Sequence, residues 1–66
     1  MAEPSVDKEG LVAEKQKLDH DLDELRQFLE GEGSRYLVGD LRIELTLQHD
    51  VMKVYSSILG LRIGRF

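Results

Sequence analysis

Leucines recur at intervals of three and four residues through the first half of this chain, and this spacing constrains the fold more than any other feature. The series comprises Leu11, Leu18, Leu22, Leu25 and Leu29. Side chains at this spacing share one face of an α-helix, so residues 11–30 are predicted to form a coiled-coil helix. Lys15 is the one polar residue in the series, and a single polar seam position fixes the register of helix pairing.

The segments that flank this helix are marked by glycine and proline. Residues 1–10 contain Pro4 and Gly10 and are predicted to form a flexible leader. Asp7 is the expected N-cap, or Ser5 if the helix begins earlier. Residues 31–34 (GEGS) predict a break after the helix, and residues 35–66 form a more apolar last segment.

The last segment carries two competing periodicities. One series has helical spacing and comprises Val38, Leu41, Leu45, Gln48, Met52, Tyr55 and Leu59. The other is the strict alternation of Leu41, Ile43, Leu45 and Leu47 with polar residues, which is typical of a half-buried strand. The helical series is longer, so it favours a second amphipathic helix over residues 34–59.

The ends of this second helix follow from the same reasoning. Ser34 is the expected N-cap, and Gly60 is expected to end the helix in a left-handed conformation. Residues 61–66 (LRIGRF) then predict a short C-terminal strand. The fold class is therefore mainly α, and the alternative is a small α+β dimer whose strands over residues 41–47 pair between chains.

Four acidic residues resemble the ligand spacing of a calcium-binding loop. They are Asp19, Asp21, Asp23 and Glu30, at positions 1, 3, 5 and 12 of a twelve-residue window. Such a loop needs glycine at position 6, where this chain has Glu24. The leucine series also runs through the window, so the acidic residues are interpreted as the solvated face of a helix.

The composition argues against catalytic, metal-bound or nucleic-acid-bound functions. His20 and His49 lie in different segments and there is no cysteine, so we expect neither a metal site nor a cofactor. Ser56 and Ser57 lack the setting of an activated nucleophile, and no catalytic residue is expected. A net charge of −4 argues against direct binding of nucleic acid. No apolar run approaches the length of a membrane span, and the second helix lacks the basic polar face of a membrane-surface helix.

Residues 50–63 (DVMKVYSSILGLRI) carry a resemblance to a known family. An apolar helical turn with Tyr55 is followed by a Leu-Gly-Leu-x-Ile step from Leu59 to Ile63. This resembles the junction between coiled coil and globular domain in RWD-type kinetochore proteins, a group that includes the short subunits of the outer-kinetochore microtubule-attachment complex and the monopolin subunits. The resemblance implies a first strand after Gly60, a nuclear assembly role in chromosome segregation, and no enzyme activity. An RWD domain has further strands and helices after the first strand, so the resemblance implies that these 66 residues are a truncated piece or a stripped-down relative.

These observations predict a non-enzymatic helical assembly or oligomerisation module. Its partner is expected to be a protein helix, in a homo- or hetero-oligomer. The predicted interface comprises Leu11, Leu18, Leu22, Leu25, Leu29, Leu41, Leu45, Met52, Tyr55 and Leu59. The alternative function is a small α+β homodimeric regulator or adaptor. An intracellular location is expected, in the nucleus if the kinetochore resemblance holds and in the cytoplasm otherwise.

Overall fold

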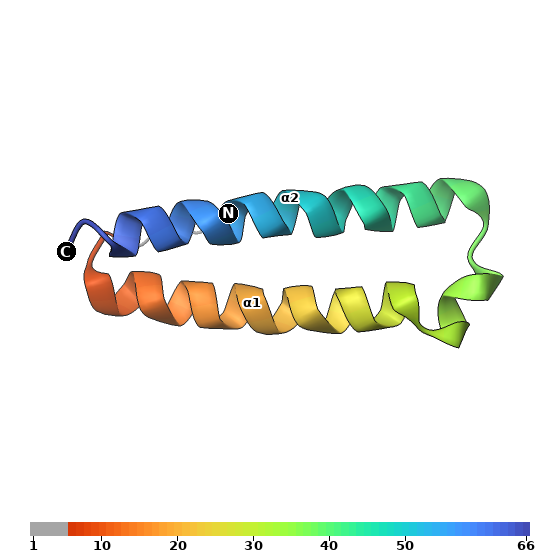
Figure 1. Cartoon of the computed structure of the whole chain (residues 1–66), viewed down its shortest axis with the longest axis horizontal. Helices are drawn as coiled ribbons and strands as arrows, with labels where there is room; N and C mark the ends of the chain where they lie inside the picture. The colour runs from red at the N-terminus through yellow and green to blue at the C-terminus, as the bar shows by residue number, and fades with distance from the viewer. Residues whose placement is uncertain (1–5) are drawn as a thin grey trace.

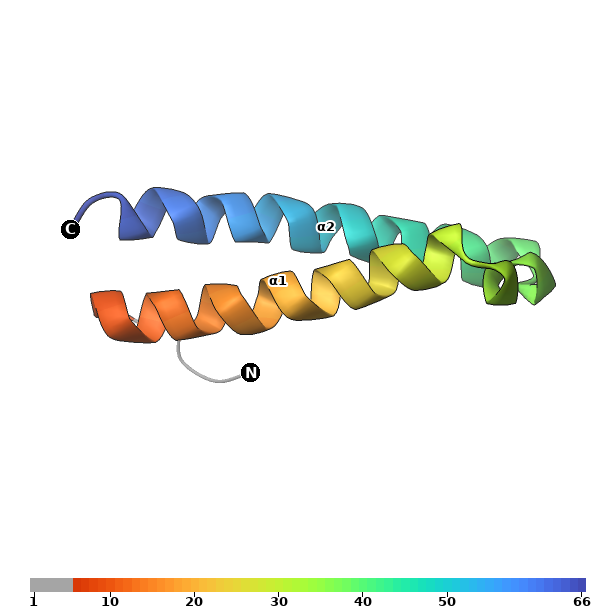
Figure 2. The same cartoon turned by 60° about the horizontal axis from the view of Figure 1, so that its bottom comes forward.

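The computed structural model describes residues 6–66 as two long helices that run antiparallel to each other (Figure 1). Helix α1 spans Lys8–Glu30, a 3₁₀ turn η1 spans Glu32–Tyr36, and helix α2 spans Gly39–Ile63. Two views separated by a rotation show the helices side by side along their length (Figure 2). The prediction of a mainly helical chain is confirmed, and the last segment folds back on the first.

Helix α1 begins with a side-chain cap. The Asp7 carboxylate accepts a hydrogen bond from the backbone N–H of Gly10 at 3.3 Å, which satisfies one of the unpaired N–H groups of the first turn. The predicted N-cap is therefore confirmed. The helix already includes Lys8, so the predicted leader is too long at its end. Residues 1–5 of the predicted leader lie outside the described residues, and they include Ser5, the alternative cap.

The turn between the helices is held by Ser34, which is buried. Its hydroxyl shares its single proton between the carbonyl oxygens of Leu29 at 2.9 Å and Gly31 at 2.8 Å. The Arg42 guanidinium donates in turn to the carbonyl oxygen of Ser34. Ser34 was expected to cap the second helix, and that prediction is wrong. The residue before α2 is Val38, and Ser34 instead stabilises the end of α1.

Helix α2 continues through Gly60 to Ile63, so the predicted left-handed stop and the C-terminal strand are both wrong. The described glycines have no positive φ. A Cβ at position 60 would lie 3.6 Å from Cε of Lys15, which places Gly60 against the side chain of the opposite helix. The Gly64 N–H donates to the Gly60 carbonyl oxygen at 3.0 Å, and this bond continues the helical ladder past the residue expected to break it.

The alternating pattern that suggested a strand has a helical explanation. Residues two apart on a helix point in nearly opposite directions. Leu45 is half-buried, whereas Ile43 and Leu47 are each 59% exposed. Apolar residues therefore occupy two faces of α2, and the α+β alternative is wrong, since residues 6–66 contain no strand.

The apolar core is small because each helix can bury only one face against the other. Leu11 in α1 and Leu59 in α2 are the fully buried apolar side chains among the described residues, at 2% and 0% exposure. The remaining apolar residues between the helices, such as Leu22 and Met52, are half-buried. Within the described part of the chain, neither helix is long and apolar enough to cross a membrane.

Candidate functional site

The α1 half of the seam is formed by the residues that the leucine spacing predicted. Leu11 is buried, and Leu18, Leu22, Leu25 and Leu29 are half-buried. Most of their neighbours along the helix are exposed. Helix α2 is the element packed along this face (Figure 1). The predicted interface residues of α1 thus contact a helix of the same chain.

The α2 half of the seam differs from the predicted series at two positions, each shifted by one residue along the chain. Its buried or half-buried series is Leu45, His49, Met52, Ser56, Leu59 and Ile63. Leu45, Met52 and Leu59 were predicted, whereas His49 and Ser56 replace Gln48 and Tyr55. A search for apolar residues passes over both because they are polar. Steps that alternate between four and three residues, starting from Leu45, predict both positions.

Two members of the predicted interface lie at its margin. Leu41 is 42% exposed. Tyr55 is half-buried at the edge of the seam, where its hydroxyl donates to the Glu14 carboxylate at 2.9 Å. This hydrogen bond raises the pKa of Tyr55, because ionisation of the phenol would remove the donor and place two negative charges together.

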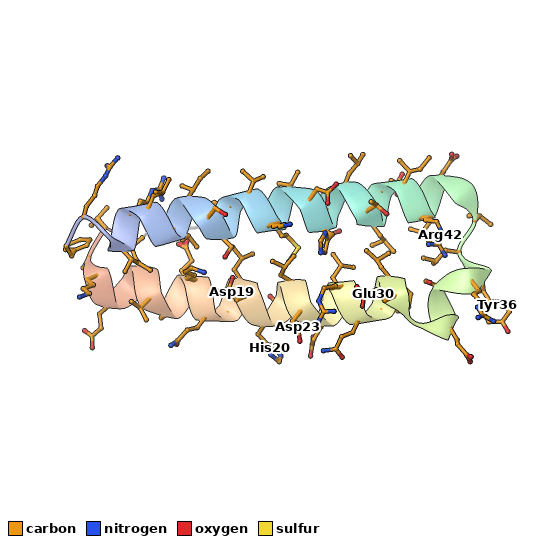
Figure 3. All side chains as sticks on the ribbon, in the orientation of Figure 1. Asp19, His20, Asp23, Glu30, Tyr36 and Arg42 are labelled. Atoms are coloured by element: carbon orange, nitrogen blue, oxygen red, sulfur yellow. The ribbon has the colours of Figure 1, made fainter. Side chains whose placement is uncertain are left out.

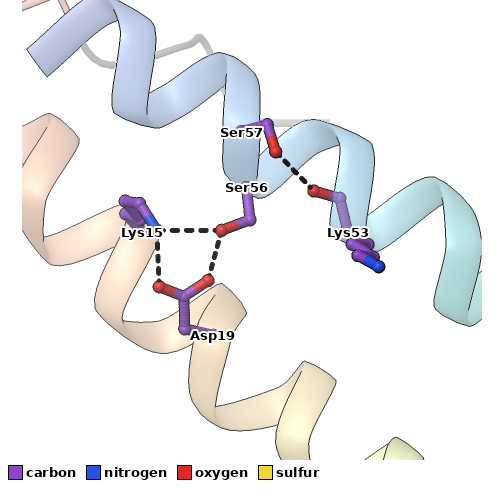
Figure 4. A network of polar contacts seen from close by, with 5 residues as sticks. All are labelled: Lys15, Asp19, Lys53, Ser56 and Ser57. Carbon is purple, nitrogen blue, oxygen red and sulfur yellow. Dashed lines mark hydrogen bonds and ion pairs between the residues drawn. The ribbon is translucent and has the colours of Figure 1, made fainter. Parts of the chain in front are cut away.

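A polar cluster crosses the seam where the sequence placed a single lysine (Figure 4). Nζ of Lys15 donates to Oδ2 of Asp19 at 2.7 Å and to Oγ of Ser56 at 2.9 Å. The Ser56 hydroxyl donates to the other oxygen of Asp19. Ser56 is only 7% exposed. The polar seam position therefore has a matching partner on α2, and this pairing ties the two helices in one register.

Asp19 has a different environment from the solvated face to which it was assigned. Its side chain is 43% exposed and accepts hydrogen bonds from both other members of the cluster. The hydrogen bond from Lys15, and next that from Ser56, lowers the pKa of Asp19 below its ordinary value. The interpretation of this one residue as purely solvated is wrong.

The other acidic residues of the calcium-like window are exposed on α1, and two of them, Asp23 and Glu30, are labelled in Figure 3. Arg26 pairs with Asp23 at 2.5 Å and with Glu30 at 3.0 Å, along the surface of α1. The hydrogen bond from Arg26 lowers the pKa of Asp23. His20 lies on the same exposed side and contacts Glu24 at 3.1 Å. Across residues 6–66, no group of three or more acidic or histidine side chains could hold a metal ion.

The second apolar face of α2 is the feature that the sequence reasoning missed. It comprises Ile43, Leu47, Val51, Val54, Ile58 and Leu61, and we call it the outer face. These side chains are between 39% and 71% exposed. Part of the face borders an open groove of about 610 Å³, whose lining includes Leu47, Met52 and Tyr55. Their three- and four-residue spacing was the available signal, but alternation with the seam residues made it resemble a strand.

The outer face presents an exposed apolar surface to solvent. Its six members are aliphatic, and Asp50 is the charged residue within the groove lining. In soluble proteins, contiguous exposed apolar surface is typical of interaction sites. The described residues thus define a class of protein: an antiparallel helical hairpin with a polar cluster between its helices and an exposed apolar face on α2.

The comparison with known families assigns this hairpin more closely. Residues 6–65, which include both helices, match the Sequestin family, and the chain belongs to that family. The comparison with curated proteins found no match, and neither did the comparison with solved structures.

Proposed function

We propose that this chain is a non-enzymatic helical assembly module that binds a partner helix through the outer face of α2. The observation that carries the proposal is the unbroken row of six exposed aliphatic side chains opposite the seam. A helix that is apolar on two sides is normally buried on both. Removing each such side chain from water contributes on the order of 1.5–3 kcal/mol when burial is complete.

The size of the chain supports the same proposal. Two helices bury one face each, and a chain of 66 residues removes too little surface from water to be more than marginally stable alone. Without cysteine no disulfide compensates for the small core. A partner helix on the outer face would add a second apolar layer to α2.

Sedimentation of the full chain over a wide concentration range tests the proposal. We expect a species heavier than the 7.6 kDa chain between about 5 and about 500 μM. Val54→Asp, in the middle of the outer face, should shift the distribution to the monomer. Gln16→Asp introduces the same charge on the exposed side of α1 and should leave association unchanged. A folded monomer at every concentration would contradict the assembly proposal.

The cellular setting of such a module remains a finer proposal. The resemblance of residues 50–63 to kinetochore coiled-coil proteins supports a place in chromosome segregation. Its expected strand is absent, because Leu61 to Ile63 are helical. Localisation of the tagged full chain during cell division tests this setting separately from the assembly function.

A further inference from the structure

We propose that the partner of the outer face is a second copy of this chain, with the two α2 helices antiparallel about a twofold axis near Val51 and Val54. The inference rests on the proposed assembly function and names its partner. It also specifies which residue of one copy meets which residue of the other.

Along the outer face, side-chain sizes follow the same order from either end: two larger residues, then a valine. In an antiparallel twofold arrangement, Val51 of each copy lies opposite Val54 of the other, because a twofold contact is reciprocal. The next pair outward joins Leu47 and Ile58, and the outermost joins Ile43 and Leu61. The small valines meet at the centre, where two helices approach most closely, and the larger side chains meet where the helices diverge.

The charges beside the outer face are complementary in the same arrangement. Glu44 and Arg62 are separated by about five helical turns, so both lie at one edge of the face. In an antiparallel pair, equivalent edges meet, and Glu44 of each copy reaches Arg62 of the other. Asp40 similarly reaches Arg65, just beyond the end of α2. Reciprocity doubles each contact, so the dimer would contain four pairs of opposite charge.

A parallel arrangement would place like charges together. The first half of α2 carries three acidic residues, Asp40, Glu44 and Asp50, and one basic residue, Arg42. Its second half carries Lys53 and Arg62, and Arg65 follows just after the helix. Parallel pairing brings the acidic halves of the two copies side by side and the basic ends side by side, and such contacts are repulsive. The antiparallel order also sets the two helix dipoles in opposite directions.

The resulting dimer is a layer of four helices. The outer face lies on the side of α2 opposite the seam, so each α1 remains on the outside and the two α2 helices form the centre. Both apolar faces of α2 are then covered, one by α1 of the same chain and one by α2 of the second copy. The acidic, arginine-bridged surface of α1 stays in water.

A charge-reversal experiment on the full chain tests both the partner and the orientation. Glu44→Arg places two arginines at each edge contact, and Arg62→Glu places two glutamates there. Each variant alone should raise the dimer dissociation constant about tenfold. An equimolar mixture should restore association, because each edge contact then joins opposite charges. Glu32→Arg, in the exposed turn, and Lys17→Glu, on the exposed side of α1, are the matched controls.

The outcomes separate this inference from the assembly proposal. Weaker association of each single variant, together with restored association of their mixture, supports the antiparallel dimer. Association that Glu44→Arg leaves unchanged or strengthens would overturn the antiparallel order while leaving an assembly module in place. Association that survives both Val54→Asp and the charge reversals would show that another surface pairs, which also overturns the inference. A monomer throughout overturns the inference together with the assembly function. Circular dichroism of each variant establishes that its helices remain folded.

Discussion

At the scale of single residues, the polar cluster inside the seam explains why the two helices pair in one register. A lysine surrounded by leucines would be costly if its ammonium group found no acceptor. Lys15 finds one on its own helix, Asp19, and one on α2, Ser56. A shift of the helices by one turn would leave Ser56 opposite an apolar residue, so the cluster opposes that shift.

Ser56→Ala should therefore destabilise the hairpin by about 1 kcal/mol, because Lys15 and Asp19 each lose a partially buried hydrogen bond. Ser57→Ala is the matched control, since that hydroxyl is exposed and bonds only the Lys53 carbonyl of its own helix. Urea unfolding followed by circular dichroism measures both. Equal effects of the two substitutions would show that the cluster does not stabilise the seam.

Asp19 should make the stability of the hairpin depend on acid pH. Its pKa in the folded chain is lowered from the usual 3.8, so its contribution is fully present above that value and is lost as pH falls through the folded-state pKa. Asp19→Asn should reduce the free energy of unfolding at neutral pH, and this penalty should shrink as the pH falls below 3.8 towards the folded-state pKa. Thermal unfolding at several pH values measures the difference.

Asp21→Asn is the control for this pH dependence, because Asp21 is an exposed acid on the same helix. It should change stability less than Asp19→Asn does at neutral pH. If the Asp19→Asn penalty persisted undiminished in acid, the hydrogen bonds to the carboxylate would not be its source.

The sequence identified one half of the cluster and not the other. Lys15 interrupts a run of leucines, and an interruption is visible against a regular background. Ser56 has no such background, because α2 is apolar on two faces and its seam contains His49 as well. A small polar residue in such a helix is recognised only when its partner across the seam is known.

At the scale of elements, α2 shows how one helix can produce the pattern of a strand. Its seam and its outer face alternate over residues 41–47, so helical and strand periodicities coincide there. Helix α1 has one apolar face, and its spacing predicted the helix and its seam residues, but not that α2 of the same chain would cover them. The end of α2 was mispredicted for a different reason. Gly60 was interpreted as a stop signal, whereas it lies opposite Lys15 within a continuous helix.

Gly60→Ala distinguishes these two roles of the glycine. The added Cβ would lie 3.6 Å from Cε of Lys15, an ordinary contact, and alanine favours the helix over glycine by roughly 0.5–1 kcal/mol. We therefore expect a higher free energy of unfolding. A left-handed glycine would instead give a loss on the same substitution, so the sign of the change in thermal melting decides between the roles.

Gly31→Ala provides the contrast within the same chain. A Cβ at that position would lie 3.1 Å from the backbone oxygen of Gln27, closer than an ordinary contact. No gain in stability is expected there, because the backbone after α1 would have to shift. A gain equal to that of Gly60→Ala would mean that the substitutions act mainly on the unfolded chain.

At the scale of the whole molecule, folding and association are expected to be coupled. The hairpin has two fully buried apolar residues among those described and exposes a comparable apolar face on α2. Any species that binds the folded chain and not the unfolded chain raises its apparent stability by mass action.

The melting temperature should accordingly rise with protein concentration, by several degrees between about 5 and about 500 μM. Val54→Asp should remove this dependence, because the variant cannot form the outer-face contact. Thermal melting followed by circular dichroism, at matched concentrations, measures this dependence for the unmodified chain and for Val54→Asp. A melting temperature that is constant for the unmodified chain would show that the hairpin is stable without a partner.

The bond between Tyr55 and Glu14 gives the chain an internal optical probe of helix pairing. The sequence has two tyrosines and no tryptophan, and Tyr36 lies exposed in the turn. In a Tyr36→Phe variant, the ultraviolet signal of phenol ionisation would come from Tyr55 alone. Because its pKa is raised above 10.0 in the folded chain, the phenolate should appear at higher alkalinity than in an unfolded peptide. The stabilisation from this bond is present below pH 10.0 and is lost as pH rises through the folded-state pKa.

A Glu14→Gln variant should lower the pH at which half of the Tyr55 phenol is ionised. Opening of the hairpin can therefore be followed without any attached label.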